Sequence, residues 1–180
     1  MKSKVEIRKS FLDRRRSLSQ KRRHVAREDL VDTLYPKLSS FTKVLSFASK
    51  EEEIDLGPLN SLLAKEGRLL FPRMMNTTEI LPFMVKDLEH ELVLHPKWKV
   101  WEPHPELCTP SSLDEISCVL VPGVGFDSFH QRIGYGKGCY DRFLSQLSCP
   151  FYGVGFKEQF FEGSLPVQSH DIPLTDTFLF

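Results

Sequence analysis

The sequence predicts an α/β fold of three layers, α/β/α, with a mainly parallel central sheet and N-terminal helices packed on it. A strand, a helix and a second strand are expected in turn over residues 44–71, an order typical of the βαβ unit of a parallel sheet. Residues 116–121 form a nearly continuous apolar run, as expected of a strand that helices cover on both faces. With 180 residues, 41% of them hydrophobic, we expect a single domain over residues 1–180.

Two helices are expected before the first strand. Residues 3–17 place apolar side chains on one side of a helix, and the three consecutive arginines at 14–16 cannot all be buried. Ser19 is a suitable N-cap for the second helix, and Pro36 should end or kink that helix near Tyr35. The apolar positions are Ile7, Phe11 and Leu18 in the first helix and Ala26, Leu30, Leu34 and Leu38 in the second.

The rest of the chain alternates between expected strands and helices, without an internal repeat. Pro72 should close the strand before it, and residues 79–85 and 91–94 are expected on a sheet edge. Residues 104–115 and 122–138 are expected to be loops. Strands are expected at 44–48, 68–71, 79–85, 91–94, 116–121, 151–156 and 177–180, and helices at 55–66, around 140–147 and at 157–161.

The charge is balanced overall but uneven along the chain. There are 24 basic and 24 acidic residues, yet residues 1–27 hold 11 Lys or Arg and only two acids. Such a segment can bind nucleic acid, an anionic ligand or the acidic rest of the chain, or it can simply be a solvated helical face. No zinc finger or aromatic RNA-binding pattern accompanies it, so we expect no specific nucleic acid partner.

Targeting and cysteine patterns favour a cytoplasmic protein. The N-terminal residues lack the apolar run of a signal peptide, and no apolar stretch approaches the roughly 20 residues that span a bilayer. We therefore expect no membrane partner. Four cysteines form no CxxC pair, and the six histidines show no zinc-binding spacing. The cysteines are Cys108, Cys118, Cys139 and Cys149.

The segment at 122–141 is rich in glycine and joins the apolar strand to a helix. Glycines let a backbone approach a ligand closely, and Arg132, Lys137 and the following helix N-terminus add positive charge. This combination favours a phosphate-binding cradle at the carboxyl end of a strand, although neither a P-loop nor a GxGxxG motif is present. The alternative is a flexible loop that needs positive φ angles. The glycines are Gly134, Gly136 and Gly138.

The run VPGVGFDSFHQRIGYGKGCYDRFL resembles the signature of the 5-formyltetrahydrofolate cyclo-ligases, also called 5,10-methenyltetrahydrofolate synthetases. The resemblance extends over nearly the whole chain. Two positions depart from it: Cys139 stands where an aromatic residue is common, and Trp101 where a smaller residue is usual. The other matching segments are Lys4 with Arg8, then 47–54, 71–73, 101–103, 155–159 and finally His170 with Asp171.

The resemblance implies an ATP- and Mg²⁺-dependent ring closure of a reduced folate. 5-Formyltetrahydrofolate would become 5,10-methenyltetrahydrofolate, with release of ADP and phosphate, after phosphorylation of the formyl oxygen. Such a reaction asks the protein for positioning and charge stabilisation and needs no enzyme nucleophile. It also implies a small-molecule substrate, and we expect a monomer.

The resemblance also assigns roles to individual residues. Catalytic roles fall to Lys137 and Arg132. ATP would be bound by Lys4, Arg8, Arg132, Ile133, Gly134, Tyr135, Gly136, Lys137, Gly138, Cys139 and Tyr140. The folate would be bound by Ala48, Glu53 and Tyr135, with Phe126 and Trp101 as further wall residues. Mg²⁺ would be held by Asp141 and Asp171.

Each assignment has an alternative. Asp141 lies in the expected first turn of a helix, where the helix dipole alone favours an acid, and Asp171 could cap a turn. Glu53 is one of three consecutive acids and could be merely solvated. At the level of the whole protein, the alternatives are a sugar-phosphate isomerase or CoA transferase of similar architecture, or a nucleic-acid binder that uses the basic segment.

Overall fold

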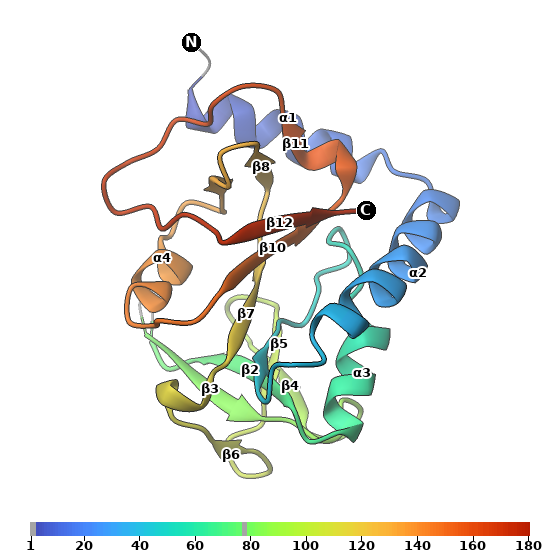
Figure 1. Cartoon of the computed structure of the whole chain (residues 1–180), viewed down its shortest axis with the longest axis vertical. Helices are drawn as coiled ribbons and strands as arrows, with labels where there is room; N and C mark the ends of the chain where they lie inside the picture. The colour runs from blue at the N-terminus through green and yellow to red at the C-terminus, as the bar shows by residue number, and fades with distance from the viewer. Residues whose placement is uncertain (1–2, 77–78) are drawn as a thin grey trace.

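A computed structural model describes residues 3–76 and 79–180 and confirms the three-layer α/β/α architecture (Figure 1). A seven-stranded sheet runs through the middle of the molecule. Its strands from β12 to β2 are parallel, whereas β3 is antiparallel to β2 and β6 is antiparallel to β3. In spatial order the strands are β12 (Asp176–Leu179), β10 (Phe151–Gly155), β7 (Cys118–Pro122), β1 (Val44–Leu45), β2 (Leu69–Met74), β3 (Ile80–Met84) and β6 (Thr109–Pro110).

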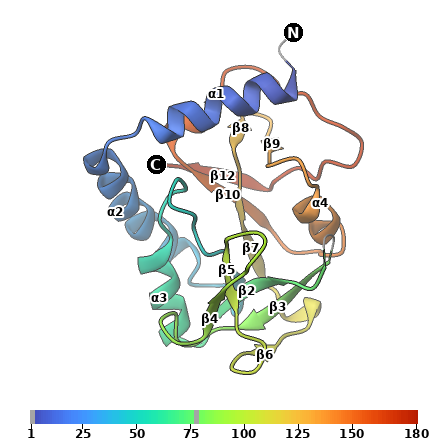
Figure 2. The ribbon, with the colours of Figure 1, turned by 180° about the vertical axis from the view of Figure 1, so that it is seen from behind.

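Helices cover both faces of this sheet (Figures 1 and 2). Residues of β7 alternate between the two layers. Leu120 packs in the apolar cluster that includes α2 and α3, whereas Val119 and Val121 pack in the cluster that includes α4. This alternation explains why the strand is apolar at successive positions. The helices are α2 (Gln20–Lys37), α3 (Gly57–Lys65) and α4 (Cys139–Leu144).

The first helix, α1 (Lys4–Arg16), lies across one end of the sheet (Figure 2). Its Ile7 and Phe11 are buried and pack against Val124, in the segment that follows β7. A β-carbon on Gly125 would lie 2.5 Å from atoms of the Phe11 ring, so this glycine permits the close approach of helix and strand. The apolar stripe predicted for the first helix thus holds α1 beside the glycine-rich segment.

Proline shapes the middle of the sheet differently from the prediction. Pro72 does not close β2, which continues to Met74 and pairs with β3 throughout. Instead, pairing between β1 and β2 stops at Leu70, because Pro72 has no amide proton to offer the neighbouring strand. Pairing of β1 with β7 also stops at Leu45, so the strand expected over 44–48 ends there.

Three other expected boundaries also change. α2 continues past Pro36, because the missing amide falls in the last turn and the amide of Leu38 still bonds to the carbonyl of Leu34. The expected loop at 104–115 contains β6 and a short 3-10 helix, and the helix expected at 157–161 is a 3-10 turn followed by β11 (Phe160–Phe161). The 3-10 turns are Leu113–Glu115 and Lys157–Gln159.

The expected loop at 122–138 contains two short strands. Together with β11 they form a small three-stranded sheet, in the order β11-β8-β9, next to α1. Phe126 of β8 is fully buried, so it cannot be the ligand wall that the sequence suggested. The strands are β8 (Gly125–Asp127), β9 (Arg132–Ile133) and β11 (Phe160–Phe161).

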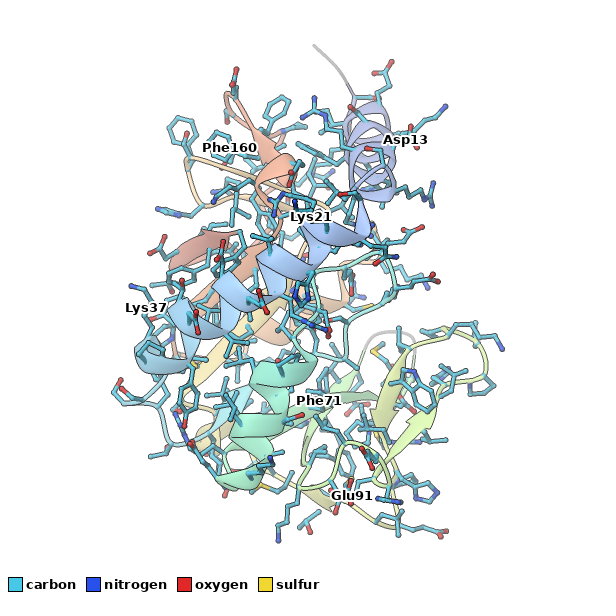
Figure 3. All side chains as sticks on the ribbon, turned by 90° about the vertical axis from the view of Figure 1, so that its right-hand side faces the viewer. Asp13, Lys21, Lys37, Phe71, Glu91 and Phe160 are labelled. Carbon is cyan, nitrogen blue, oxygen red and sulfur yellow. The ribbon has the colours of Figure 1, made fainter. Side chains whose placement is uncertain are left out.

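Residues 91–94 do not extend the edge of the main sheet, as was expected. They contribute β4 (Leu92–Leu94), which pairs with β5 (Trp101–Pro103) in a separate hairpin. In Figure 3 this hairpin, marked by Glu91, stands to one side of α3. An ion pair of 2.9 Å between Arg73 and Glu102 ties it to β2. Among the described residues, no helix has the length and apolar character that crossing a membrane requires.

Candidate active site

A cavity of about 450 Å³ lies at the ends of β1, β2 and β7, between the glycine-rich segment and the β4–β5 hairpin. In open α/β sheets, ligands bind outside the carboxyl ends of the parallel strands, and this cavity has that position. The predicted site residues that line it are Ala48, Glu53, Arg132, Gly134, Tyr135, Lys137, Gly138, Cys139, Tyr140 and Asp141. Trp101, a suggested wall residue, also lines it.

The remaining predicted residues lie on the α1 side of the glycine-rich segment. Lys4 Nζ forms an ion pair of 2.7 Å with Asp171 Oδ2. Arg8 Nε donates a hydrogen bond of 2.9 Å to the carbonyl of Gly134. Ile133 is buried beneath α1, and a β-carbon on Gly136 would lie 3.2 Å from Arg8 Nη2. α1 therefore packs against the glycine-rich segment, and neither Lys4 nor Arg8 lines the cavity itself.

Two glycines give this segment its turn. Gly136 has a φ of +95° and Gly138 a φ of +62°, which is the left-handed region that other residues rarely adopt. Gly138 is the N-cap of α4, so the chain passes directly from the turn into the helix that carries Asp141. The positive φ angles that the alternative interpretation of this loop requires are present at Gly136 and Gly138 but not at Gly134, and they let the backbone curve around the cavity.

Glu53 is the buried acid of the three at positions 51–53, with an exposed fraction of 8%. Its Oε2 accepts a hydrogen bond of 3.0 Å from the amide of Lys50, and its Oε1 accepts one of 3.1 Å from the hydroxyl of Tyr135. Burial, and after it the charge of Glu53, raises the pKa of Tyr135 to about 12. The phenol is therefore protonated at neutral pH and can act as a donor to Glu53.

The two expected metal ligands lie near each other but are paired with cations. Arg132 Nη2 is 2.7 Å from Asp141 Oδ1, which also accepts a hydrogen bond from the amide of Ile172. Burial works to raise the pKa of Asp171, but hydrogen bonds from Lys4 and the amide of Gln168 outweigh it and lower that pKa. Within the described ranges, no cluster of three or more acidic, histidine or cysteine side chains could hold a metal ion.

Lys137 reaches across the cavity to the β4–β5 hairpin. Its Nζ lies 4.3 Å from the centre of the Trp98 ring, and such a contact is a cation–π interaction. The Trp98 Nε1 atom is buried and has no hydrogen-bond partner among the residues that the structure describes. Lys50 makes a similar contact of 4.3 Å with the ring of Tyr135. Aromatic faces thus hold two lysines at the wall of the cavity.

The sequence did not predict four residues of this site. They are Arg15, Lys50, Trp98 and Glu102, the last being a buried acid. Arg15 could have been found, because it lies on the same helical face as Lys4 and Arg8. Trp98 has no comparable signal, since only the pairing of β4 with β5 brings it to the cavity.

Comparison with known proteins gives a consistent match. The sequence profile of the 5-formyltetrahydrofolate cyclo-ligase family matches residues 1–179. The 5-formyltetrahydrofolate cyclo-ligase of Escherichia coli K12 is 30% identical over 145 residues, which are 78% of this chain and 79% of that protein. The protein of the same name from Mycoplasma pneumoniae is 27% identical over 176 residues, 95% of this chain and 94% of that one.

Solved structures resemble the fold over most of its length. The NMR structure of the 5,10-methenyltetrahydrofolate synthetase of Aquifex aeolicus has a TM-score of 0.82 at 30% identity, covering 95% of this chain and 86% of that one. A 5,10-methenyltetrahydrofolate synthetase from Mycoplasma pneumoniae has a TM-score of 0.78 and covers 98% of both chains; at 22% identity this likeness supports the fold alone.

Proposed function

This chain belongs to the 5-formyltetrahydrofolate cyclo-ligase family, and on that premise we propose that ATP and Mg²⁺ drive its reaction at the cavity described above. The chain is an enzyme of the ligase class that acts on a reduced folate. In this proposal, residues 1–180 form one domain that works as a monomer.

The proposed steps balance without an enzyme nucleophile. The formyl oxygen of 5-formyltetrahydrofolate attacks the γ-phosphorus of ATP, and ADP leaves with the electrons of the broken P–O bond. The phosphorylated oxygen is now a good leaving group. The N10 amine attacks the formyl carbon, phosphate departs with the C–O bonding electrons, and N10 loses its proton. The product is the cyclic methenyl cation.

One observation carries this proposal: a single cavity brings Glu53 and Tyr135 together with Lys137 of the glycine-rich segment. A carboxylate can accept hydrogen bonds from the N–H groups of a pterin ring. Lys137 and Arg132 supply positive charge where a phosphoryl group would be transferred. We therefore assign the folate to the Glu53 side, with Ala48 and the side chain of Tyr135, and the triphosphate to residues 132–140, where Tyr135 would contribute its backbone.

Lys4 and Arg8 would support the triphosphate from α1. Arg8 already contacts the carbonyl of Gly134, and Lys4 is paired with Asp171. When the nucleotide binds, its phosphates would replace the Asp171 carboxylate as the ion-pair partner of Lys4. Other basic residues of the segment 1–27 contact the protein itself, as in the two hydrogen bonds from Arg22 to Glu158. These contacts favour interaction with the acidic rest of the chain over a nucleic-acid groove.

The residues present fit Mg²⁺ only together with nucleotide phosphates. Mg²⁺ usually takes one or two carboxylates, several waters and substrate phosphate oxygens. Asp141 and Asp171 supply the carboxylates, and the absence of a third acidic ligand among the described residues agrees with this shared type of site. When bound, the ion would neutralise charge on the phosphates.

The test is a direct assay of the purified protein. With 5-formyltetrahydrofolate, ATP and Mg²⁺, we expect the methenyl chromophore to appear together with one phosphate per product. Omission of ATP, or addition of a chelator, should abolish both signals. Methenyl formation at an unchanged rate without ATP would contradict the proposed energy source, and phosphate release without folate turnover would contradict the coupling of the two steps.

A further inference from the structure

Arg15 of α1 is a buried charge that the steps above do not use. Its exposed fraction is 1%, whereas its neighbours Arg14 and Arg16 are exposed. Charged side chains are almost never fully buried unless they are paired. Apolar residues of similar volume often serve stability as well or better at such positions, so the partners of this guanidinium indicate what it is kept for.

The partners of Arg15 are few and specific. Its Nη2 donates a hydrogen bond of 2.7 Å to the hydroxyl of Tyr135. The same nitrogen also forms a longer ion pair of 3.5 Å with Glu52 Oε2, while the other oxygen of Glu52 lies 2.7 Å from Arg16 Nε. Arg15 Nε and Nη1 are buried without a hydrogen-bond partner among the described residues. The bond to the Tyr135 hydroxyl is therefore the shortest polar contact of this side chain, and its guanidinium also lies 5.8 Å from the centre of the Tyr135 ring.

The direction of the hydrogen bonds follows from the chemistry of the groups. A guanidinium only donates, so the Tyr135 oxygen must accept from Arg15. The phenolic proton is then available to Glu53 Oε1, 3.1 Å away. The second oxygen of Glu53 accepts from the amide of Lys50 at 3.0 Å. A chain of two hydrogen bonds thus runs from Arg15 through Tyr135 to the carboxylate on the cavity wall.

Helix α1 connects these hydrogen bonds to the residues proposed to bind the nucleotide. Lys4, Arg8 and Arg15 are four and seven residues apart, which places them on one face of α1. Arg8 contacts the carbonyl of Gly134, and Arg15 contacts the side chain of the next residue, Tyr135. One rigid helix therefore contacts the glycine-rich segment at two adjacent positions.

We propose that Arg15 is a positioning residue, which acts through Tyr135 to hold Glu53 in place for the folate. The inference rests on the proposed function of Glu53. Arg15 itself touches neither substrate in this arrangement. Its effect should appear in the binding of the folate, because the carboxylate loses its fixed orientation when the chain of hydrogen bonds is broken.

The experiment compares Michaelis constants for the two substrates in matched variants. Arg15→Met removes the donor and keeps the length of the side chain, and Arg15→Lys keeps a donor. Tyr135→Phe breaks the chain at its middle, and Arg14→Met is the control at the exposed neighbour. We expect Arg15→Met and Tyr135→Phe to raise KM for 5-formyltetrahydrofolate about tenfold, with KM for ATP changed less than about twofold. Arg15→Lys should fall between Arg15→Met and the parent.

A double-variant cycle separates positioning from mere structural support. In the Tyr135→Phe protein the chain is already broken, so adding Arg15→Met should raise KM for the folate little further. Equal increases in both Michaelis constants, or full additivity, would overturn the inference. If Arg15→Met does not fold, an unchanged folate KM in Tyr135→Phe still overturns it.

A further variant distinguishes this failure from failure of the proposed function. Glu53→Gln should itself raise KM for 5-formyltetrahydrofolate. If it does not, the assignment of Glu53 to the folate is wrong and the role of Arg15 falls with it. If Glu53→Gln has the expected effect while Arg15→Met and Tyr135→Phe behave like Arg14→Met, the inference about Arg15 alone is wrong.

Discussion

The two sides of the cavity hold their charged groups by different means. On one side, Glu53 is held by neutral donors, the hydroxyl of Tyr135 and the amide of Lys50. On the other side, the cations are held by other charged or aromatic groups. At the cavity wall these contacts are Arg132 with Asp141 at 2.7 Å and Lys137 with the ring of Trp98 at 4.3 Å. The pair of Lys4 with Asp171, also at 2.7 Å, lies next to this wall, on the α1 side of the glycine-rich segment.

This difference has consequences for how each side would receive its ligand. A carboxylate fixed by neutral donors keeps its position when a ligand arrives, which is the property of a preorganised site. Paired cations must exchange partners before they can bind phosphate, and the broken pairs subtract from the affinity for the nucleotide. Changes on the folate side should therefore alter binding of the folate alone, whereas changes on the nucleotide side should alter nucleotide affinity, turnover or metal dependence.

The largest effect is expected at Lys137. Removing one well-placed donor to a transition state typically costs about 10² to 10³ in rate, so Lys137→Ala should lose kcat by that factor and stay folded. Lys97→Ala is a matched control, since Lys97 also lies over the Trp98 ring, at 5.4 Å, but is exposed and away from the cavity. Steady-state kinetics measure this kcat, and near-normal turnover of Lys137→Ala would show that Lys137 has no role in the chemical steps.

Glu53→Gln should have the next largest effect. A hydrogen bond to a charged group contributes about 1.5 to 3 kcal/mol, so KM for 5-formyltetrahydrofolate should rise by about tenfold to a hundredfold, with KM for ATP nearly unchanged. Glu51→Gln is the control, because Glu51 is an exposed acid two residues away. A larger change in KM for ATP than for folate would move Glu53 to the nucleotide side and erase the contrast between the two sides.

A smaller effect is expected at the carboxylates of the nucleotide side. Asp141→Asn and Asp171→Asn keep the shape of the side chain and remove its charge. Each should raise the Mg²⁺ concentration for half-maximal activity severalfold, because a single charge near the protein surface contributes only a modest free energy to binding. Asp114→Asn, at an exposed position, should leave the titration unchanged. Mg²⁺ titrations of both variants that match the parent would reduce these acids to partners of Arg132 and Lys4.

The predictable parts of the molecule depend on local patterns. The apolar run at 116–121 predicted a buried strand because helices cover both of its faces, and β7 (Cys118–Pro122) lies within a residue or two of it. The glycines at 136 and 138 predicted positive φ angles because other residues rarely adopt them. These signals are legible because each depends on neighbours within a few residues.

The parts that escaped prediction depend on contacts between distant segments. The sequence around Trp98 contains no pattern that predicts its contact with Lys137, because the pairing of β4 with β5 brings the ring there. Pairing of β1 with β2 likewise stops before Pro72, a residue of the next strand, and pairing of β1 with β7 stops at the same point. Arg15 looks like its exposed neighbours in the sequence, and only the position of Tyr135 against α1 makes it a buried donor.

The smallest expected effect tests whether the cation–π contact of Lys137 competes with the nucleotide. A cation over an aromatic ring contributes roughly 0.5 to 1 kcal/mol at exposed sites, and Trp is a better partner than Phe. Trp98→Phe should therefore weaken the hold on Lys137 and lower the Kd of Mg–ATP by about twofold, measured by calorimetry without folate. Phe160→Leu changes an aromatic side chain that is 40% exposed and outside the cavity, so it should leave this Kd unchanged. An increased Kd in Trp98→Phe would mean that the ring supports nucleotide binding. It would contradict the view that Lys137 must leave the Trp98 ring before it can bind the nucleotide.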